Sequence, residues 1–159
     1  MISALVTASK FFSTLSSFVT IGALLALAFL VLDKEGKHST SGLKIRSIVS
    51  ISALLWFLSS FLNILFTLAN ILGEPLSGVL YPTVLQSFIF QISLGQYLFF
   101  QAVIALFVAV TSRITTSTGY TAILLLISLI AIAAPVFQSH SASSGSHALA
   151  IGSLFVHVI

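Results

Sequence analysis

Three of the four histidines lie between residues 135 and 159, and they are the side chains in this sequence best suited to bind a metal ion. His140 and His147 lie seven residues apart in the segment SHSASSGSH, and His157 lies in the apolar run that follows. Neutral imidazole is a common ligand of copper, zinc and haem iron. The chain has no cysteine, and its single methionine is Met1, so thiolate ligands are excluded and thioether ligands almost so. The sequence therefore predicts a candidate metal site formed by imidazoles.

The three histidines are predicted to lie at different depths. The Ser/Gly segment favours a polar loop, and Ser146 is a suitable N-cap for a following helix. Such a helix would carry His157 about 15 Å deeper than His147, on a face turned by about 80°. His140 and His147 can then form an outer pair, with His157 near the middle of the membrane. The spacing alone also fits two other interpretations: solvated loop histidines, and a buried His157 that is hydrogen-bonded to a neighbouring helix.

The composition indicates an all-α integral membrane protein. Hydrophobic residues make up 58% of the 159 positions and charged residues 6%, with a mean hydropathy of +1.19. Soluble domains carry about 25% charged residues, because a polar surface must cover their core. The isoelectric point near 9.6 rests on six basic and three acidic residues, so it does not indicate nucleic-acid binding. The expected surroundings of the chain are a lipid bilayer.

Four apolar runs have about the length needed to cross a hydrocarbon core about 30 Å thick. They predict a multi-helix transmembrane bundle with full spans at residues 11–32, 48–72, 94–112 and 120–137. A fifth apolar run, 148–159, is too short to cross the bilayer. We therefore expect a single transmembrane domain over residues 1–159 whose truncated fifth span continues beyond Ile159.

The segment between the second and third spans is less apolar and contains two prolines. Its later part, TVLQSFIFQIS, would place Val84, Phe88 and Ile92 on one face of a helix, with Gln86 and Gln91 off that face. This pattern predicts a short interfacial helix that lies on the membrane. An irregular loop that dips toward the helices is the alternative.

The lysines and arginines predict an orientation in the cell membrane. The connection 33–46 holds four of the six basic residues, and the connection after the third span holds Arg113. The positive-inside rule places both connections in the cytoplasm. The N-terminus, the segment 73–93 and the loop with His140 and His147 are then extracytoplasmic. His38 lies in the basic connection and is expected to be solvated.

No aspartate, glutamate, lysine or arginine lies within the predicted spans, which argues against a carboxylate proton relay. The amides of Asn63 and Gln101 are expected to hydrogen-bond to neighbouring helices. Gly22 and Ala23 are expected to pack at a helix contact, and Trp56 is expected in the core. Two of the three acidic residues are predicted on the opposite side of the membrane from the loop histidines. No Ser–His–acid set can then form, and we expect no enzymatic activity.

Several segments of the chain are similar to a known family. APVFQSHSASSGSHALAIGSLFVHVI, TIGALLALAFLVL and GEPLSGVLYPTVLQSFIFQISLGQ resemble the copper-resistance protein D (CopD) family in their order along the chain. The resemblance extends to the actinobacterial form, in which a CopD-like half is fused to a cytochrome c oxidase assembly (CtaG-type) half. The family's Trp-Gly-Gly continuation and its additional first helix are absent, so we expect a longer chain at both ends. Ser139 stands where the family has glycine before its first loop histidine.

The resemblance implies copper transport or copper delivery at the cell membrane, with copper bound by metal ligands at His140, His147 and His157. It also implies partners such as an extracytoplasmic copper-binding protein or oxidase subunits. Two other functions remain open at this point. One is a haem-binding electron-transfer membrane module with His157 as an axial ligand. The other is a non-catalytic assembly or scaffold subunit of a respiratory oxidase.

Overall fold

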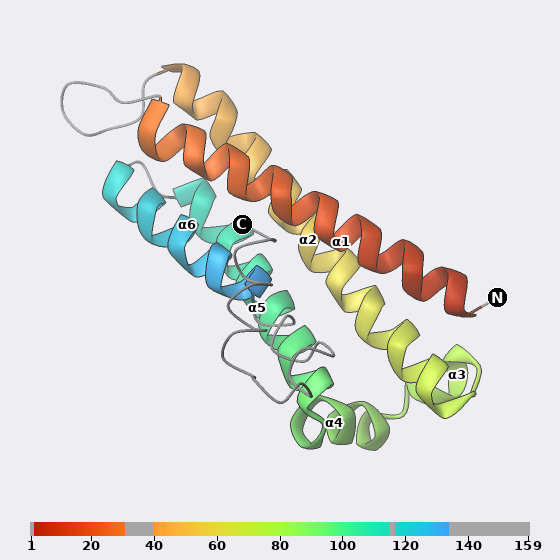
Figure 1. Cartoon of the computed structure of the whole chain (residues 1–159). Coiled ribbons are helices and arrows are strands. Elements are labelled where there is room, and N and C mark those ends of the chain that lie inside the picture. The colour runs from red at the N-terminus through yellow and green to blue at the C-terminus, as the bar shows by residue number, and fades with distance from the viewer. Residues whose placement is uncertain (1, 31–39, 115–116, 134–159) are drawn as a thin grey trace, which may run out of the picture.

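The computed structural model describes residues 2–30, 40–114 and 117–133, which fold into helices. In chain order these elements are α1 (Ile2–Leu25), the π-helical turn η1 (Ala26–Leu30), α2 (Thr40–Leu72), α3 (Leu76–Val79), α4 (Pro82–Gln91), α5 (Ser93–Ile114) and α6 (Thr118–Ala133). Figure 1 shows α1 and α2 side by side and antiparallel, with α3 and α4 turning the chain at the end where α2 finishes. The described residues thus confirm the all-α class.

The four longer helices pack as a ring in which each touches two neighbours. α2 contacts α1 and α5, while α6 contacts α1 and α5 from the other side. One core cluster draws buried side chains from η1 and from all four helices: Leu24, Leu27, Val49, Ala53, Val108, Ala109, Leu124 and Leu125. The core therefore lies where the four helices meet.

Among the described residues, three helices are long and apolar enough to cross a membrane. These segments are Ile2–Leu30, Gly42–Leu72 and Ser93–Ile114, and they correspond to the first three predicted spans. The helices extend beyond the predicted bounds, so that Lys10, Arg46 and Arg113 lie within them rather than in connections. The reason is that apolar length sets the part inside lipid, whereas a helix continues into water wherever its residues allow it.

The fourth predicted span, 120–137, corresponds to α6. The described helix ends at Ala133 and is 16 residues long, which gives about 24 Å of helix. That length is less than the hydrocarbon thickness of about 30 Å. The last four residues of the predicted span lie outside the described residues, as does the whole predicted fifth span, 148–159.

α2 ends at Leu72, where the second predicted span ends, and the chain then turns. Gly73 has a φ of +68°, the left-handed conformation that commonly ends a helix, and Pro75 precedes α3. The expected short helix is present as α4, with Pro82 in its first turn. Its predicted face is only partly correct, because Phe88 is 1% exposed whereas Ile92 is 44% exposed and lies beyond the helix end.

The corner between α4 and α5 requires a glycine. A Cβ atom added to Gly95 would lie 2.1 Å from the carbonyl oxygen of Phe88, much closer than any real contact. The side-chain amide of Gln96 donates to the carbonyl oxygen of Phe90 over 2.8 Å and joins the two helices at the same corner. The backbone of α4 can therefore lie directly on the first turn of α5.

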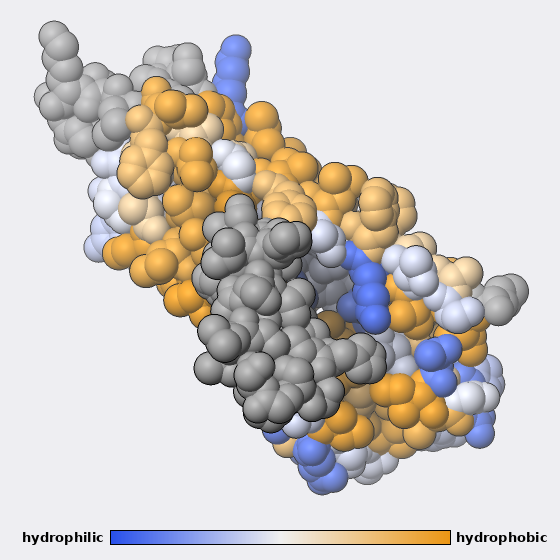
Figure 2. All heavy atoms as spheres, in the orientation of Figure 1, coloured by the Kyte–Doolittle hydropathy of each residue, from blue (hydrophilic) through white to orange (hydrophobic). Residues whose placement is uncertain are grey.

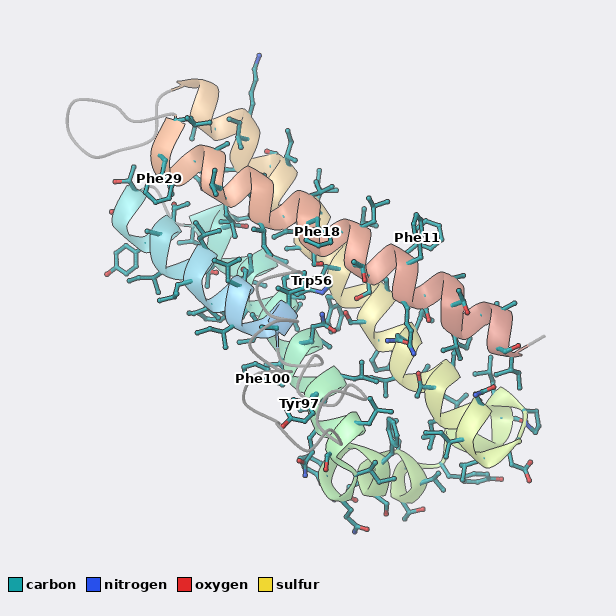
Figure 3. The ribbon with its side chains drawn as sticks, viewed as in Figure 1. Phe11, Phe18, Phe29, Trp56, Tyr97 and Phe100 are labelled. Carbon is teal, nitrogen blue, oxygen red and sulfur yellow. The ribbon has the colours of Figure 1, made fainter. Side chains whose placement is uncertain are left out.

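Large apolar side chains cover the outside of the bundle. The face in Figure 2 is mostly hydrophobic over the described residues. Phe11 of α1 is 62% exposed and Phe29 of η1 is 61% exposed, and Figure 3 shows Phe11 on the outer side of α1. Exposed aromatic and aliphatic side chains over the full length of a helix are suited to a lipid environment.

Candidate functional site

The predicted metal ligands His140, His147 and His157 lie outside the described residues, and so does His38. Within the described part of the chain, no group of three or more histidine, cysteine, aspartate or glutamate side chains is placed to hold a metal ion. The polar groups that the structure does bring together are of another kind. They form a seam between α1 and α2, and a basic cleft between α2 and α5.

Small polar side chains line the contact between α1 and α2. On α1 the polar residues of this face recur every three or four positions, which places them on one side of the helix. On α2 their partners are also buried. The hydroxyl seam consists of Ser9, Ser13, Ser17 and Thr20 on α1 with Ser52, Ser60, Asn63 and Thr67 on α2.

Two hydrogen bonds between hydroxyl groups cross the seam. The Oγ atoms of Ser13 and Ser60 lie 2.8 Å apart, and Thr20 Oγ1 donates to Ser52 Oγ over 2.9 Å. All four side chains are at most 6% exposed. Buried hydroxyl pairs of this kind hold membrane helices together, because an unpaired polar group in an apolar setting costs free energy.

Asn63 joins the seam at the end near α3. Its Oδ1 accepts hydrogen bonds from Ser9 Oγ at 3.4 Å and from Thr67 Oγ1 at 3.2 Å. The bond to Ser9 confirms the expected partnership of Asn63 with a neighbouring helix. Gln101 is also buried, at 7% exposed, but its side-chain amide forms no hydrogen bond with another described residue.

The predicted packing role of Gly22 is wrong. Gly22 is exposed, and a Cβ atom added there would meet nothing within 4 Å. Ala23 is only partly buried. The buried face of α1 instead passes through Thr20 and Leu24, and two positions after Thr20 the helix has turned by about 200°. Gly22 therefore points away from the helix contact.

Trp56 fills the space between α2, α5 and α6. The side chain is 0% exposed and packs with Ala105 of α5 and Ala131 of α6, whose small size makes room for the indole (Figure 3). The expected core position of Trp56 is thus confirmed. Among the described residues its Nε1–H group has no hydrogen-bond acceptor. An unpaired donor of this kind costs about 1–3 kcal/mol, which the packing of the ring must exceed.

The chemistry of the seam fits helix pairing better than copper binding. Its donors and acceptors are hydroxyl and amide groups, whereas copper in proteins is held mainly by imidazole and sulfur ligands. A ladder of buried hydrogen bonds does, however, fix the register between α1 and α2.

Sequence reasoning treated Arg46 and Arg113 only as markers of orientation, and the structure adds a direct contact between them. Arg46 Nε donates to the carbonyl oxygen of Ser112 over 3.1 Å, and Arg46 Nη2 donates to the carbonyl oxygen of Arg113. Arg113 Nε donates to Ser50 Oγ over 2.7 Å. Residues 46 and 113 lie far apart in the chain, so only the antiparallel packing of α2 and α5 could reveal this basic cleft.

A comparison with protein families gives a match. The family model for the copper resistance protein D-like N-terminal domain matches residues 1–149. The chain belongs to this copper resistance protein D-like family. No curated protein and no solved structure is significantly similar to it.

The family match and the fold together identify a copper resistance protein D-like membrane protein. The matched region contains His140 and His147 and ends before His157. The suspected resemblance to the CopD family is confirmed, and with it a general role in copper resistance or transport.

Proposed function

We propose that this chain transports or delivers copper at the cell membrane through imidazole ligands. The family match over residues 1–149 is the observation that carries this proposal. The composition supports it, because a chain without cysteine and with Met1 as its single methionine has histidine as its main side chain for binding copper. Copper is the cargo in this proposal rather than a resident cofactor, and no enzymatic step is involved.

His140 and His147 capture the ion on the extracytoplasmic side in this proposal, and His157 lies further along its path. Imidazoles seven and ten residues apart cannot all face one point of a regular helix. Successive sites with an outer pair and a deeper ligand therefore suit the spacing better than a single site. The delivery of copper to oxidase subunits during assembly is the further step that the suspected fusion would require.

The histidine ligands are tested by copper accumulation in cells that express the protein. His147→Ala and His157→Ala, alone and combined, should reduce accumulation toward that of cells without the protein. His38→Ala is the matched control, because it removes the same side chain from the basic connection and should leave accumulation unchanged. All variants are compared at equal amounts of protein in the membrane. Normal accumulation in the combined variant would show that these histidines do not carry copper.

The proposed orientation follows from the positions of the basic residues. Arg46 and Arg113 lie at the same end of the bundle, because they are joined through Ser112 and Ser50. The positive-inside rule favours the cytoplasm for that end. The opposite end, with α3 and α4, is then extracytoplasmic.

A further inference from the structure

A basic cleft opens between the beginning of α2 and the end of α5. Its volume is about 370 Å³. Four of its lining side chains are charged or polar, and two are apolar. The cleft is lined by Leu43, Arg46, Ser47, Ser50, Ile51 and Arg113. Two guanidinium groups facing one small space are suited to a phosphate group, because each offers donors in a planar fork.

Both arginines are held in place by bonds that leave donors unused. Arg46 bonds through Nε and Nη2 to backbone carbonyl oxygens in the last turn of α5. Arg113 bonds through Nε to Ser50 Oγ, and no other hydrogen bond of its side chain to a described residue is present. A guanidinium has five N–H donors, so several remain on each side chain. The cleft therefore presents fixed donors to a bound anion with little loss of side-chain entropy.

No carboxylate of the described residues neutralises the two arginines. Glu74 is the one acidic residue within the described ranges, and it follows the far end of α2. The length of α2 between Arg46 and Leu72 is about 40 Å, far beyond a screening length of about 10 Å. The carbonyl groups at the end of α5 offset only a fraction of a charge. Within the described residues the charges of Arg46 and Arg113 therefore have no carboxylate partner, which favours a bound anion.

An apolar groove continues from the basic cleft along α2 and α5. Its volume is about 420 Å³, and it shares Ser50 and Arg113 with the cleft. Beyond these two residues its lining is apolar, with Leu54, Leu106 and Val110 exposed by 40% or more. The groove lies on the outer surface that suits lipid. A ligand that occupies both spaces needs an anionic head joined to a hydrocarbon chain.

We propose that the cleft and the groove together bind one anionic phospholipid. The phosphate group lies between Arg46 and Arg113, and one acyl chain lies along Leu106 and Val110. Basic pockets between transmembrane helices bind anionic headgroups in this way, and anionic lipids give the cytoplasmic leaflet its negative surface potential. A zwitterionic lipid carries the same phosphate, but its ammonium group is repelled by two arginines. A free phosphate ion would use the cleft and leave the groove empty.

The proposal is tested by the binding of lipids to the purified full-length protein in detergent. Native mass spectrometry counts the bound lipids, and thermal melting reports the stabilisation by each. Dioleoylphosphatidylglycerol should bind in preference to dioleoylphosphatidylcholine. Arg46→Gln and Arg113→Gln should each weaken this preference about fivefold, as expected for one basic residue next to an anionic surface. Lys44→Gln is the matched control, because Lys44 is exposed near the same end of α2 but does not line the cleft.

Each alternative has a distinct outcome in these assays. An unchanged preference in both arginine variants would overturn the proposal, and so would an equal loss in Lys44→Gln, which would indicate diffuse attraction. Equal stabilisation by inorganic phosphate or glycerol phosphate would assign the cleft to a free anion and also overturn it. Arg113→Lys keeps the charge in the same place, so it should retain most of the preference and shows that the glutamine variants act through charge.

The groove is tested by a substitution that leaves both arginines intact. Val110 is 52% exposed and lines the groove but not the cleft. Val110→Trp should therefore fill the groove, reduce the binding of dioleoylphosphatidylglycerol and leave the fold intact. Val103→Trp is the matched control, because Val103 is 45% exposed on the same helix and does not line the groove. Full lipid binding in Val110→Trp would contradict the placement of an acyl chain there.

Discussion

Ser13 of α1 and Ser60 of α2 form a hydrogen bond of 2.8 Å inside the bundle, and both side chains are at most 4% exposed. The pair lies near the middle of a seam that also joins Thr20 to Ser52 and Ser9 to Asn63. The partners' numbers fall in α2 as they rise in α1. The hydrogen bonds of the seam therefore fix the antiparallel register of α1 and α2.

The Ser13–Ser60 bond should show energetic coupling. Ser13→Ala and Ser60→Ala should each lower the free energy of unfolding by about 1 kcal/mol, because each leaves a buried hydroxyl without its partner. The double variant should lose less free energy of unfolding than the two single variants together, with a coupling energy of about 0.6 kcal/mol. Unfolding in mixed micelles measures all three. Ser16→Ala is the control, because Ser16 bonds only within its own helix. Strict additivity would mean that the bond contributes nothing.

Substitution of Asn63 by alanine should destabilise the protein more than the same substitution of an exposed asparagine on α2. Asn63→Ala removes the acceptor of both Ser9 and Thr67, so we expect a loss of about 1–3 kcal/mol in the free energy of unfolding. Asn70 is exposed, and Asn70→Ala should change stability by less than about 0.5 kcal/mol. The same unfolding assay compares them. An equal loss of stability in both variants would show that the hydrogen bonds of Asn63 in the seam do not stabilise the protein.

Substitution by alanine should lower the stability of the protein at Gly95 and raise it at Gly22. Gly95→Ala places a Cβ atom against the carbonyl oxygen of Phe88, so the α4–α5 corner must shift at a cost of about 1–3 kcal/mol. Gly22→Ala meets no neighbour within 4 Å and should stabilise α1 by up to about 1 kcal/mol. Thermal melting of the two variants measures this difference. A Gly95→Ala protein that melts like the wild type would contradict the close approach of α4 to α5.

Trp56 should stabilise the fold through the packing of its ring rather than through its N–H group. Trp56→Phe keeps an aromatic ring among Ala105 and Ala131 and removes the unpaired donor, so we expect a loss below about 1.5 kcal/mol. Trp56→Ala should cost about 3–5 kcal/mol because it leaves a cavity. Denaturation followed by circular dichroism compares the two. If both cost the same, the indole N–H has a partner that contributes most of the energy.

The orientation can be tested with single cysteines, because residues 1–159 contain none. Glu74→Cys should react with a membrane-impermeant maleimide added to intact cells, since Glu74 follows α2 at the proposed extracytoplasmic end. Lys44→Cys should react only after the membrane is permeabilised. Both positions are exposed, so a lack of reaction reports the membrane side rather than burial. The reverse pattern would invert the proposed topology.

The sequence by itself determined the kind of fold and most of its elements. In lipid every backbone polar group must be satisfied within a helix or a closed barrel, so long apolar runs predict helices directly. The end of the second span at residue 72 was equally visible, and the structure shows Gly73 and Pro75 ending α2 there through local geometry. Helix ends were less accurate: α1 begins at Ile2 and carries Lys10, since charged residues in water can continue a helix that began in lipid. The copper-ligand hypothesis for His140, His147 and His157 rests on sequence alone.

Only the tertiary structure decided which residues meet. The order of polar residues in α1 did not indicate that Ser13 would bond to Ser60, and neither the corner at Gly95 nor the basic cleft at Arg46 and Arg113 was visible in the sequence. Gly22 was placed on the wrong face for the same reason. Such contacts depend on the rotation and register of whole helices, which many weak packing contacts set together. Local composition is enough to specify a helix, whereas the residues that it contacts depend on how all the helices pack together.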